Sequence, residues 1–448
     1  DYNDLTLPSD GHLFKEYEGV ELYKVLLKDS KNNINTSDSE QTFITGENPN
    51  NYIWYSGKLW RAVSIDPADN SVKLVTQWNI SSIPFSRDER PFDNSYVEMW
   101  LNDTSVDGFL GNLREAENFI KMDSKWNATM TMGTSKPSKT TIVENPVGLL
   151  NAYEYTKSYT GTTYSKGYLN NGLWWFLITS YDKTRIRGVD KSGSIVEDLN
   201  GNSGGIRPSI NLKPGIKTVG GKGTEEDPYR LKGDNDKSLS GILVSSRYSG
   251  EYVIFGTGEN NLYRIVSHET DGLTKVTSAE PLKENSKFKT SAFGSNTAFS
   301  SSNTIGKFLN NDYLNNGTYL TSEQKSMIED NTTWYLGTVA DGQHYRLAKY
   351  KDYTMSEITS KKTTAKVGLL RLGELMSGQF TESNKSKDYF TLTPHSQWMK
   401  YIYTDSDANE LLPTSASGIK PALNLKSNII ITSGDGTLQN PFQIELSS

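Results

Sequence analysis

The sequence predicts an α+β fold with mostly antiparallel sheets and short helices, built from one module that is used twice. Three observations predict this class. The chain of 448 residues is long enough for two or three domains. Aromatic residues reach 11% although apolar residues make up only 35%, and short apolar runs are separated by turn residues. Five sequence blocks also recur in the same order later in the chain.

The first predicted element of the module is a β-hairpin at residues 52–60. Apolar runs flank Ser56 and Gly57, a pair that suits a tight turn between antiparallel strands. The remaining predicted elements are a strand at 72–76, helices at 95–101 and 114–121, a buried strand at 174–179 and an extended strand at 206–213. Pro208 indicates an edge or a bulge in the last strand, because proline has no backbone N–H to donate.

The strongest repeated block is Gly-Ile-Arg-Pro-Ser-Ile-Asn-Leu-Lys at 205–213, which recurs as Gly-Ile-Lys-Pro-Ala-Leu-Asn-Leu-Lys at 418–426. The other blocks are 60–64 with 263–267, 100–102 with 308–310, 147–150 with 367–370, and 221–229 with 434–442. A period of about 200 residues indicates a duplicated domain and not a solenoid. We therefore predict an N-terminal segment (1–50), a first unit (51–232), a linker (233–250) and a second unit (251–448).

The N-terminal segment matches neither unit. Its coherent element is a predicted helix at 16–28, where Tyr17, Val20, Tyr23 and Leu27 form an apolar stripe. Residues 31–42 are polar and predicted to be loop.

The ordered motifs are Trp60-Arg61-x-Val63, Trp100-Leu101-Asn102, Val147-Gly148-Leu149-Leu150, the tryptophan-rich strand from Trp174, and the strand from Gly205. Their order resembles a domain of unknown function that is widespread in exported proteins of Firmicutes, often beside pilin-like leaders or cell-wall anchors. The last two motifs are also similar to the C-type-lectin-like fold shared with formylglycine-generating enzymes. The resemblance implies two tandem C-type-lectin-like modules. The second unit departs from it, with Asp388-Tyr389-Phe390 in place of the tryptophan pair.

Composition excludes several classes of protein. The 47 Lys and Arg against 53 Asp and Glu give a net charge of −6, which disfavours a nucleic-acid partner. No run approaches the about 18 apolar residues of a membrane-spanning helix. The absence of cysteine excludes disulfides and thiol chemistry, formylglycine-generating activity included, and is common in exported Gram-positive proteins. The chain begins at Asp1, which suggests a removed leader, so we predict an extracellular protein, on the cell surface or secreted.

No motif predicts a catalytic site. Residues 201–205 match the surroundings of a trypsin-like serine, but His12 is the only histidine before Ser203, so this segment is predicted to be a turn. The four histidines have no zinc-binding spacing. Glu154 and Glu374 occupy equivalent positions, each at a predicted helix start, where an acid stabilises the N-terminus.

Metal and sugar sites have only partial motifs. Asp405, Asp407 and Asn409 place side-chain oxygens at alternate positions, as in a calcium loop, but the glycine and distant glutamate of an EF-hand are missing. Two interpretations stay open, an acidic loop without an ion and a calcium site; no other cofactor is predicted. The lectin sugar motif is absent, since 144–146 reads Glu-Asn-Pro in the wrong order.

The candidate binding residues are tryptophans and two repeated cations. Adjacent strand residues face opposite sides, so one of Trp174 and Trp175 is predicted to pack in the core and the other to be available for stacking. The other candidates of this kind are Trp54, Trp398, Arg207 and Lys420. Core packing is the alternative for the tryptophans, and a buried carboxylate partner is the alternative for the two cations.

These features predict a non-catalytic, extracellular bacterial surface protein that acts in adhesion or in surface or pilus-like assembly. Its predicted partner is a host or cell-surface protein or glycan, or a sister subunit. One alternative is a carbohydrate-binding module that uses exposed aromatic residues. Another is a glycoside-active enzyme, which needs a cleft with paired carboxylates.

Overall fold

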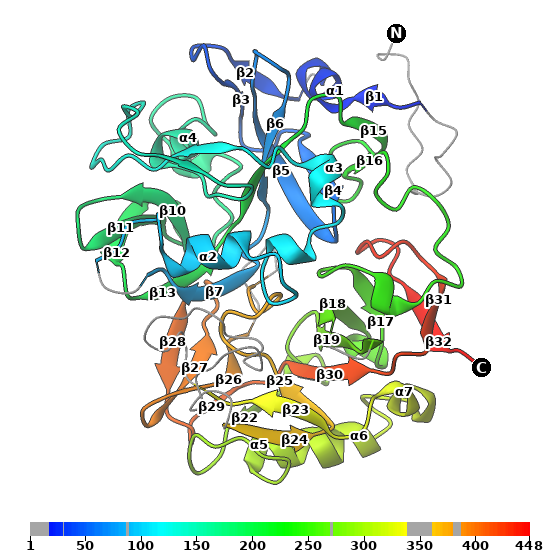
Figure 1. The fold of residues 1–448 in the computed structure, drawn as a ribbon. Coiled ribbons are helices and arrows are strands. Elements are labelled where there is room, and N and C mark those ends of the chain that lie inside the picture. The colour runs from blue at the N-terminus through cyan, green and yellow to red at the C-terminus, as the bar shows by residue number, and fades with distance from the viewer. Residues whose placement is uncertain (1–17, 30, 87–88, 269–271, 338–360, 380–386) are drawn as a thin grey trace.

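The computed structural model describes residues 18–29, 31–86, 89–268, 272–337, 361–379 and 387–448. We call residues 18–232 the first half and residues 250–448 the second half; in Figure 1 the first half lies above the second. The described residues form mainly antiparallel sheets, and none of their α-helices is longer than seven residues. This confirms the predicted α+β class at its coarse level. Within the same residues no helix has the length and apolarity needed to cross a membrane.

The first half contains two sheets. Nine strands form the larger sheet: β1 (Val20–Glu21), β2 (Asn33–Asn35), β3 (Thr42–Thr45), β4 (Tyr52–Tyr55), β5 (Lys58–Ile65), β6 (Val72–Thr76), β14 (Ser209–Leu212), β15 (Lys217–Gly220) and β16 (Tyr229–Leu231). Five strands form the smaller sheet: β7 (Ser81–Pro84), β10 (Trp175–Ser180), β11 (Arg185–Val189), β12 (Ile195–Leu199) and β13 (Ser203–Ile206).

A separate two-stranded ribbon and four short helices complete this half. The ribbon is β8 (Lys125–Asn127) with β9 (Ile142–Glu144). The helices are α1 (Leu22–Lys28), α2 (Tyr96–Asn102), α3 (Ala116–Phe119) and α4 (Ala152–Thr156). Ser95 caps α2 by accepting a hydrogen bond from the Glu98 amide, as its position before the predicted helix suggests.

The second half also contains two main sheets, and each has five strands. One consists of β17 (Tyr252–Ile254), β18 (Leu262–His268), β19 (Thr274–Ser278), β30 (Pro421–Leu425) and β25 (Val367–Leu369). The other consists of β22 (Thr290–Ala292), β29 (Ala416–Gly418), β26 (Tyr389–His395), β27 (Trp398–Ile402) and β28 (Ala408–Leu411). Three strand pairs lie apart: β20 (Lys283–Glu284) with β21 (Lys287–Phe288), β23 (Thr332–Tyr335) with β24 (Lys362–Ala365), and β31 (Ile429–Ser433) with β32 (Gln443–Leu446). The helices are α5 (Thr304–Lys307), the π-helical turn η8 (Phe308–Asp312), α6 (Tyr313–Asn315) and α7 (Ser322–Met327).

Strand pairings in the first half recur in the second. The strand β10 pairs in parallel with β13 through Trp175 and Gly205, and β26 pairs in parallel with β29 through Tyr389 and Gly418. The antiparallel chain β4–β5–β6–β14 corresponds to β17–β18–β19–β30. In the first half β16 lies parallel to β4, and Phe442 makes a parallel bridge to β17 in the second. The five repeated sequence blocks thus occupy comparable places in both halves.

The strand predicted at 206–213 is divided at Pro208. Residues before the proline form β13 in the smaller sheet, and residues after it form β14 in the larger sheet. The carbonyl of Pro208 still accepts a hydrogen bond from the Thr76 amide, but proline has no N–H to continue a ladder. The helix predicted at 114–121 is also shorter than expected, since α3 covers only its middle.

The N-terminal segment does not stand apart from the first unit. The predicted helix at 16–28 begins only at Leu22, since Val20 lies on β1, and β2 falls within the predicted loop at 31–42. The strand β1 pairs with β15, and β3 pairs with β5, so this segment extends the larger sheet. Leu22 and Leu26 on α1 are buried in the core. Tyr17 of the predicted helical stripe lies outside the described residues.

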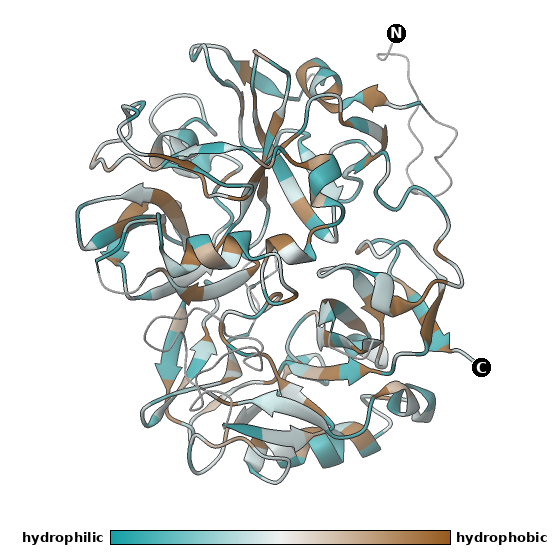
Figure 2. Cartoon of the chain, viewed as in Figure 1, coloured by the Kyte–Doolittle hydropathy of each residue, from teal (hydrophilic) through white to brown (hydrophobic). Residues whose placement is uncertain are grey.

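The two halves share an apolar core and a buried polar seam. One cluster of apolar side chains extends through both halves, and apolar residues concentrate on the strands and on α2 in Figure 2. At the seam Arg230 forms an ion pair with Asp435 at 2.8 Å, and both side chains are buried. The Lys58 ammonium donates to the Ser249 carbonyl at 2.7 Å, and burial lowers the pKa of Lys58 to about 7. Asn235, in the predicted linker, is buried as well.

Candidate functional site

Two of the predicted stacking platforms are buried. Trp54 is 3% exposed and stacks on Tyr252 of the second half, with ring centroids 6.3 Å apart. Trp175 is fully buried on β10 and packs edge-on against Tyr155. Their contacts are therefore structural, because Trp54 packs between the halves and Trp175 packs in the core. This agrees with core packing, the alternative interpretation of these tryptophans.

The repeated cations are buried too. Arg207 donates through Nε to the Thr76 carbonyl at 2.6 Å and lies over the Trp175 ring. Lys420 donates to the Met376 carbonyl at 2.8 Å and lies over the Tyr389 ring. Burial lowers the pKa of Arg207 to about 9 and that of Lys420 to about 7. The described contacts of these cations are with carbonyl oxygens and aromatic rings. The sequence had predicted a ligand or a buried carboxylate as their partner.

Trp174 and Trp398 are the half-buried members of the predicted set. The Trp174 ring packs against Gly188 and Gly204 and meets Phe176 edge-on at 4.9 Å. Trp398 lies on β27 in the other half. The structure does not bring these two rings into one site.

The predicted calcium loop forms a turn. Asp405 accepts a hydrogen bond from the Asp407 amide at 3.0 Å, and the Asn409 side chain interacts with Tyr401. Among the described residues no group of three or more His, Asp or Glu side chains is arranged to hold a metal ion. Ser203 lies within β13, opposite Pro84, and His12 falls outside the described part of the chain.

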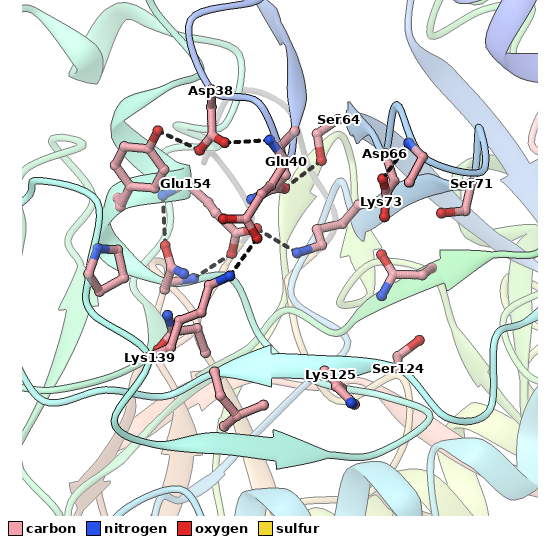
Figure 3. Close-up of a pocket in the computed structure, with 18 of the residues that line it drawn as sticks. Asp38, Glu40, Ser64, Asp66, Ser71, Lys73, Ser124, Lys125, Lys139 and Glu154 are labelled. Atoms are coloured by element: carbon pink, nitrogen blue, oxygen red, sulfur yellow. Dashed lines mark hydrogen bonds and ion pairs between the residues drawn. The ribbon is translucent and has the colours of Figure 1, made fainter.

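The site that the geometry does build is a polar cleft of about 1040 Å³ in the first half. Figure 3 shows its side chains converging from segments far apart in the sequence. Most of the lining comes from four segments: the connection between β2 and β3 at 38–41, the strands β5 and β6 with their turn, the β8–β9 ribbon with its long connection, and the start of α4. Residues 121–124 and Asn211 on β14 complete it. The cleft therefore exists only in the folded chain.

An ion pair forms the floor of the cleft. The Lys73 ammonium lies 2.5 Å from the Glu154 carboxylate, whose side chain is 3% exposed. Glu154 also belongs to a capping box, because its side chain accepts from the Asn151 amide while Asn151 accepts from the Glu154 amide. Lys73 lies 5.1 Å from the centre of the Trp126 ring on the ribbon. The floor is thus fixed from three elements.

A network centred on Asp38 closes one end of the cleft. Asp38 accepts from Lys136 at 2.9 Å and from the Tyr153 hydroxyl at 2.8 Å, while Glu40 pairs with Lys136 and Lys139. Burial raises the pKa of Asp38, but hydrogen bonds from the Glu40 amide, Lys136 and Tyr153 outweigh burial and leave it below 3.8. The two lysines, Lys139 first, also lower the pKa of Glu40. Both carboxylates are therefore held in the ionised form.

The floor recurs among the described residues of the second half. Lys275 pairs with Glu374 at 2.9 Å and lies 5.0 Å from the Trp334 ring centre, as in the first half. Arg371 takes the place of Asn151, is buried, and donates to the Gly337 carbonyl at 2.6 Å. The Lys–Glu pair is thus a feature of both halves, and the wall at 38–41 comes from the N-terminal segment alone.

The sequence interpretation missed most of this site. Asp38 and Lys136 are 98 positions apart and carry no motif, so only the fold reveals that they meet. A signal for the floor was present, since Glu154 and Glu374 are equivalent and Lys73 and Lys275 lie on corresponding strands. A repeated acid and a repeated base of this kind predict a buried pair.

Comparisons with protein-family models, with curated proteins and with solved structures found no match to this chain.

Proposed function

We propose that this chain is a non-catalytic, extracellular bacterial surface protein that acts in adhesion or surface assembly, and that the cleft binds its ligand. The ligand we propose is a polypeptide segment of a cell-surface protein or of a sister subunit. The observation that carries the proposal is the cleft itself, because side chains of both charges from four segments converge there around solvent-accessible space.

The charge state of the cleft favours binding over catalysis. A carboxyl that acts as a general acid needs a raised pKa near the working pH. Asp38 and Glu40 have lowered pKa values instead, and lysines neutralise them. The pairs of Glu40 with Lys136 and Lys139 are exposed, so each contributes less than about 1 kcal/mol and exchanges readily for a ligand charge.

The rim of the cleft favours a polypeptide over a sugar. Ile142 is an apolar side chain that lines the cleft, and it is 43% exposed. A peptide supplies apolar and charged side chains together, which matches an exposed isoleucine among charged groups. Stacking on aromatic rings is the usual sugar contact, and Trp126, the tryptophan beside the floor, is buried.

We further propose that residues 51–232 and 251–448 are two copies of one module of the exported Firmicutes type. The recurring strand pairings and the recurring Lys–Glu–Trp floor support a duplication. The C-type-lectin-like architecture remains part of this proposal.

Exchange of one cross-strand charge pair tests the role of the cleft. Lys125 and Glu144 are directly opposed on the outer face of the ribbon and line the cleft. The double variant Lys125→Glu/Glu144→Lys keeps their mutual attraction but reverses the pattern offered to a ligand. We expect it to lose binding to a panel of cell surfaces and matrix proteins, or self-association in sedimentation, whereas Lys183→Glu outside the cleft retains them.

Two outcomes would contradict the proposal. Turnover of a glycoside substrate by the pure protein, abolished by Glu154→Gln, would make the chain an enzyme. Binding confined to a glycan array and unchanged by the charge exchange would favour the carbohydrate-binding alternative.

A further inference from the structure

A second, smaller pocket lies in the second half, remote in sequence from the cleft residues. Its volume is about 350 Å³. It is lined by residues from the β20–β21 hairpin region and from the continuous turn of η8 and α6: Glu284, Lys289, Phe308, Asn311, Asp312, Asn315, Asn316 and Tyr319. A π-helical turn such as η8 is rare and is frequent at functional sites, because the wider turn changes the direction of its side chains.

Tyr319 lines this pocket with an unused hydroxyl group. The residue is 3% exposed, and its ring packs against Tyr313 and edge-on against Phe308. Within the described residues its hydroxyl makes no hydrogen bond. Burial raises the pKa of Tyr319 to about 12, and the carboxylates of Glu284 and Asp312 contribute. The hydroxyl is therefore neutral at physiological pH and is available to form a hydrogen bond with a ligand in the pocket.

Side-chain amides line the same pocket as Tyr319. Asn311 and Asn315 lie one turn apart, and the Asn315 amide donates to the Asn311 oxygen at 3.2 Å. Each side-chain amide has two donor hydrogens and a carbonyl oxygen, so this bond leaves the NH₂ group of Asn311 available. Asp312 adds carboxylate oxygens to the same lining. The pocket thus offers closely spaced donors and acceptors.

The remaining wall combines a ring with an exchangeable ion pair. Phe308 is half-buried, and the Lys289 ammonium lies 5.1 Å from its ring centre and 3.2 Å from Glu284. The Lys289 and Glu284 side chains are 29% and 51% exposed, so water screens their attraction and a ligand hydroxyl can share both groups.

We infer that this pocket binds a neutral sugar residue. The hydroxyls of a pyranose match amides, a carboxylate and a phenol, and the volume is that of a small-ligand site. Lys289 in the lining and Lys325, which donates to the Asn315 side-chain oxygen, balance the Glu284 and Asp312 carboxylates, so no excess positive charge selects an anionic ligand. In the first half Trp100 stands at the position of Phe308 and is fully buried on a regular helix, so the inferred site belongs to the second half alone.

The test uses the full chain with methyl glycosides of glucose, galactose, mannose and N-acetylglucosamine, followed by saturation-transfer NMR and calorimetry. We expect at least one neutral glycoside to bind with a Kd of about 1–10 mM, and glucuronate to bind more weakly. Tyr319→Phe removes only the hydroxyl and should weaken binding about tenfold, as should Asn311→Ala at an exposed position. Thermal unfolding checks that both variants fold.

Tyr153→Phe in the cleft is the matched control and should leave sugar binding unchanged. The inference is overturned if none of the four glycosides binds at about 50 mM. It is equally overturned if binding persists in both pocket variants, if Tyr153→Phe abolishes it, or if glucuronate binds more tightly than every neutral sugar. None of these results bears on peptide binding in the cleft.

Discussion

Asp407 shows how the surroundings of one carboxyl create a pH-dependent stability. Burial raises its pKa from 3.8 to about 7, and the negative charges of Asp405 and of Asp198 in the first half add to the effect. A raised pKa means that the folded state prefers the protonated carboxyl. The stability that protonation provides is present below about pH 4 and is lost as the pH rises through 7.

Asp407→Asn should therefore stabilise the protein at pH 8 and have little effect at pH 4. The asparagine stays neutral at both pH values, so it avoids placing a charge beside Asp405 and Asp198. We expect a gain of roughly 1–3 kcal/mol in the free energy of unfolding at pH 8. Urea unfolding at the two pH values measures this difference, and an equal effect at both would contradict the assignment.

Lys73→Met should destabilise the first half by about 3–5 kcal/mol, because it leaves the buried Glu154 carboxylate without its cation. The double variant Lys73→Met/Glu154→Gln should recover part of the loss. Lys275→Met, at the corresponding pair, provides the matched comparison. Chemical unfolding of the four proteins checks this, and a loss below about 1 kcal/mol would show that the pair is solvated.

At the residue scale, the sequence predicted the buried residues that recur in both halves, but it did not predict the residues of the cleft. Arg207 and Lys420 were found because they recur, and they recur at buried positions that both halves need. Asp38 and Lys136 do not recur, since the wall they form comes from a segment present once. Self-comparison finds what two modules share and misses what only one has.

The β8–β9 ribbon is held by contact between a glycine and a tryptophan. A Cβ atom placed on Gly148 would lie 2.3 Å from the Trp126 ring, and one placed on Gly368 would lie 2.6 Å from the Trp334 ring. The motif Val-Gly-Leu-Leu thus recurs because the ring packs directly on the backbone. The close contact explains why glycine stands at positions 148 and 368, which the sequence alone did not explain.

Gly148→Ala should cost about 1–3 kcal/mol by displacing the Trp126 ring, and should also weaken ligand binding because the ribbon lines the cleft. Gly201→Ala is the control, since a Cβ atom there meets no atom within 4 Å. Thermal unfolding of the two variants checks the prediction. Equal melting temperatures would mean that the ribbon moves freely away from the core.

Elements with local signals were predictable, and elements decided by distant partners were not. The hairpin of β4 and β5 forms as expected, because its turn is encoded by adjacent residues, with Ser56 and Gly57 both at positive φ. The strand from Ile206 was predicted as one element, yet β13 and β14 join different sheets. No local pattern states which distant strand will pair with each part.

For the whole molecule, the seam between the halves decides whether they unfold together. Asp435→Asn removes the partner of buried Arg230 and should cost about 3 kcal/mol, with the loss concentrated at the seam. We expect the single unfolding transition to broaden or separate into two. Asp182→Asn, which breaks an exposed pair with Arg185 at 2.6 Å, should leave stability nearly unchanged, because water screens the attraction. Calorimetry of both variants measures the difference; one unchanged sharp transition for Asp435→Asn would show that the apolar core alone couples the halves.

The parallel neighbours β4 and β16 have a mechanical consequence. They lie close to the two ends of residues 51–232, and tension applied to those ends pulls the two strands in opposite directions along their length. All hydrogen bonds between them are then strained together in shear, whereas an antiparallel terminal pair would open like a zip, one bond at a time. The bridge from Phe442 to β17 repeats this arrangement in the second half. Single-molecule pulling with attachment points at residues 51 and 232 should therefore show a high rupture force for the pair of β4 and β16.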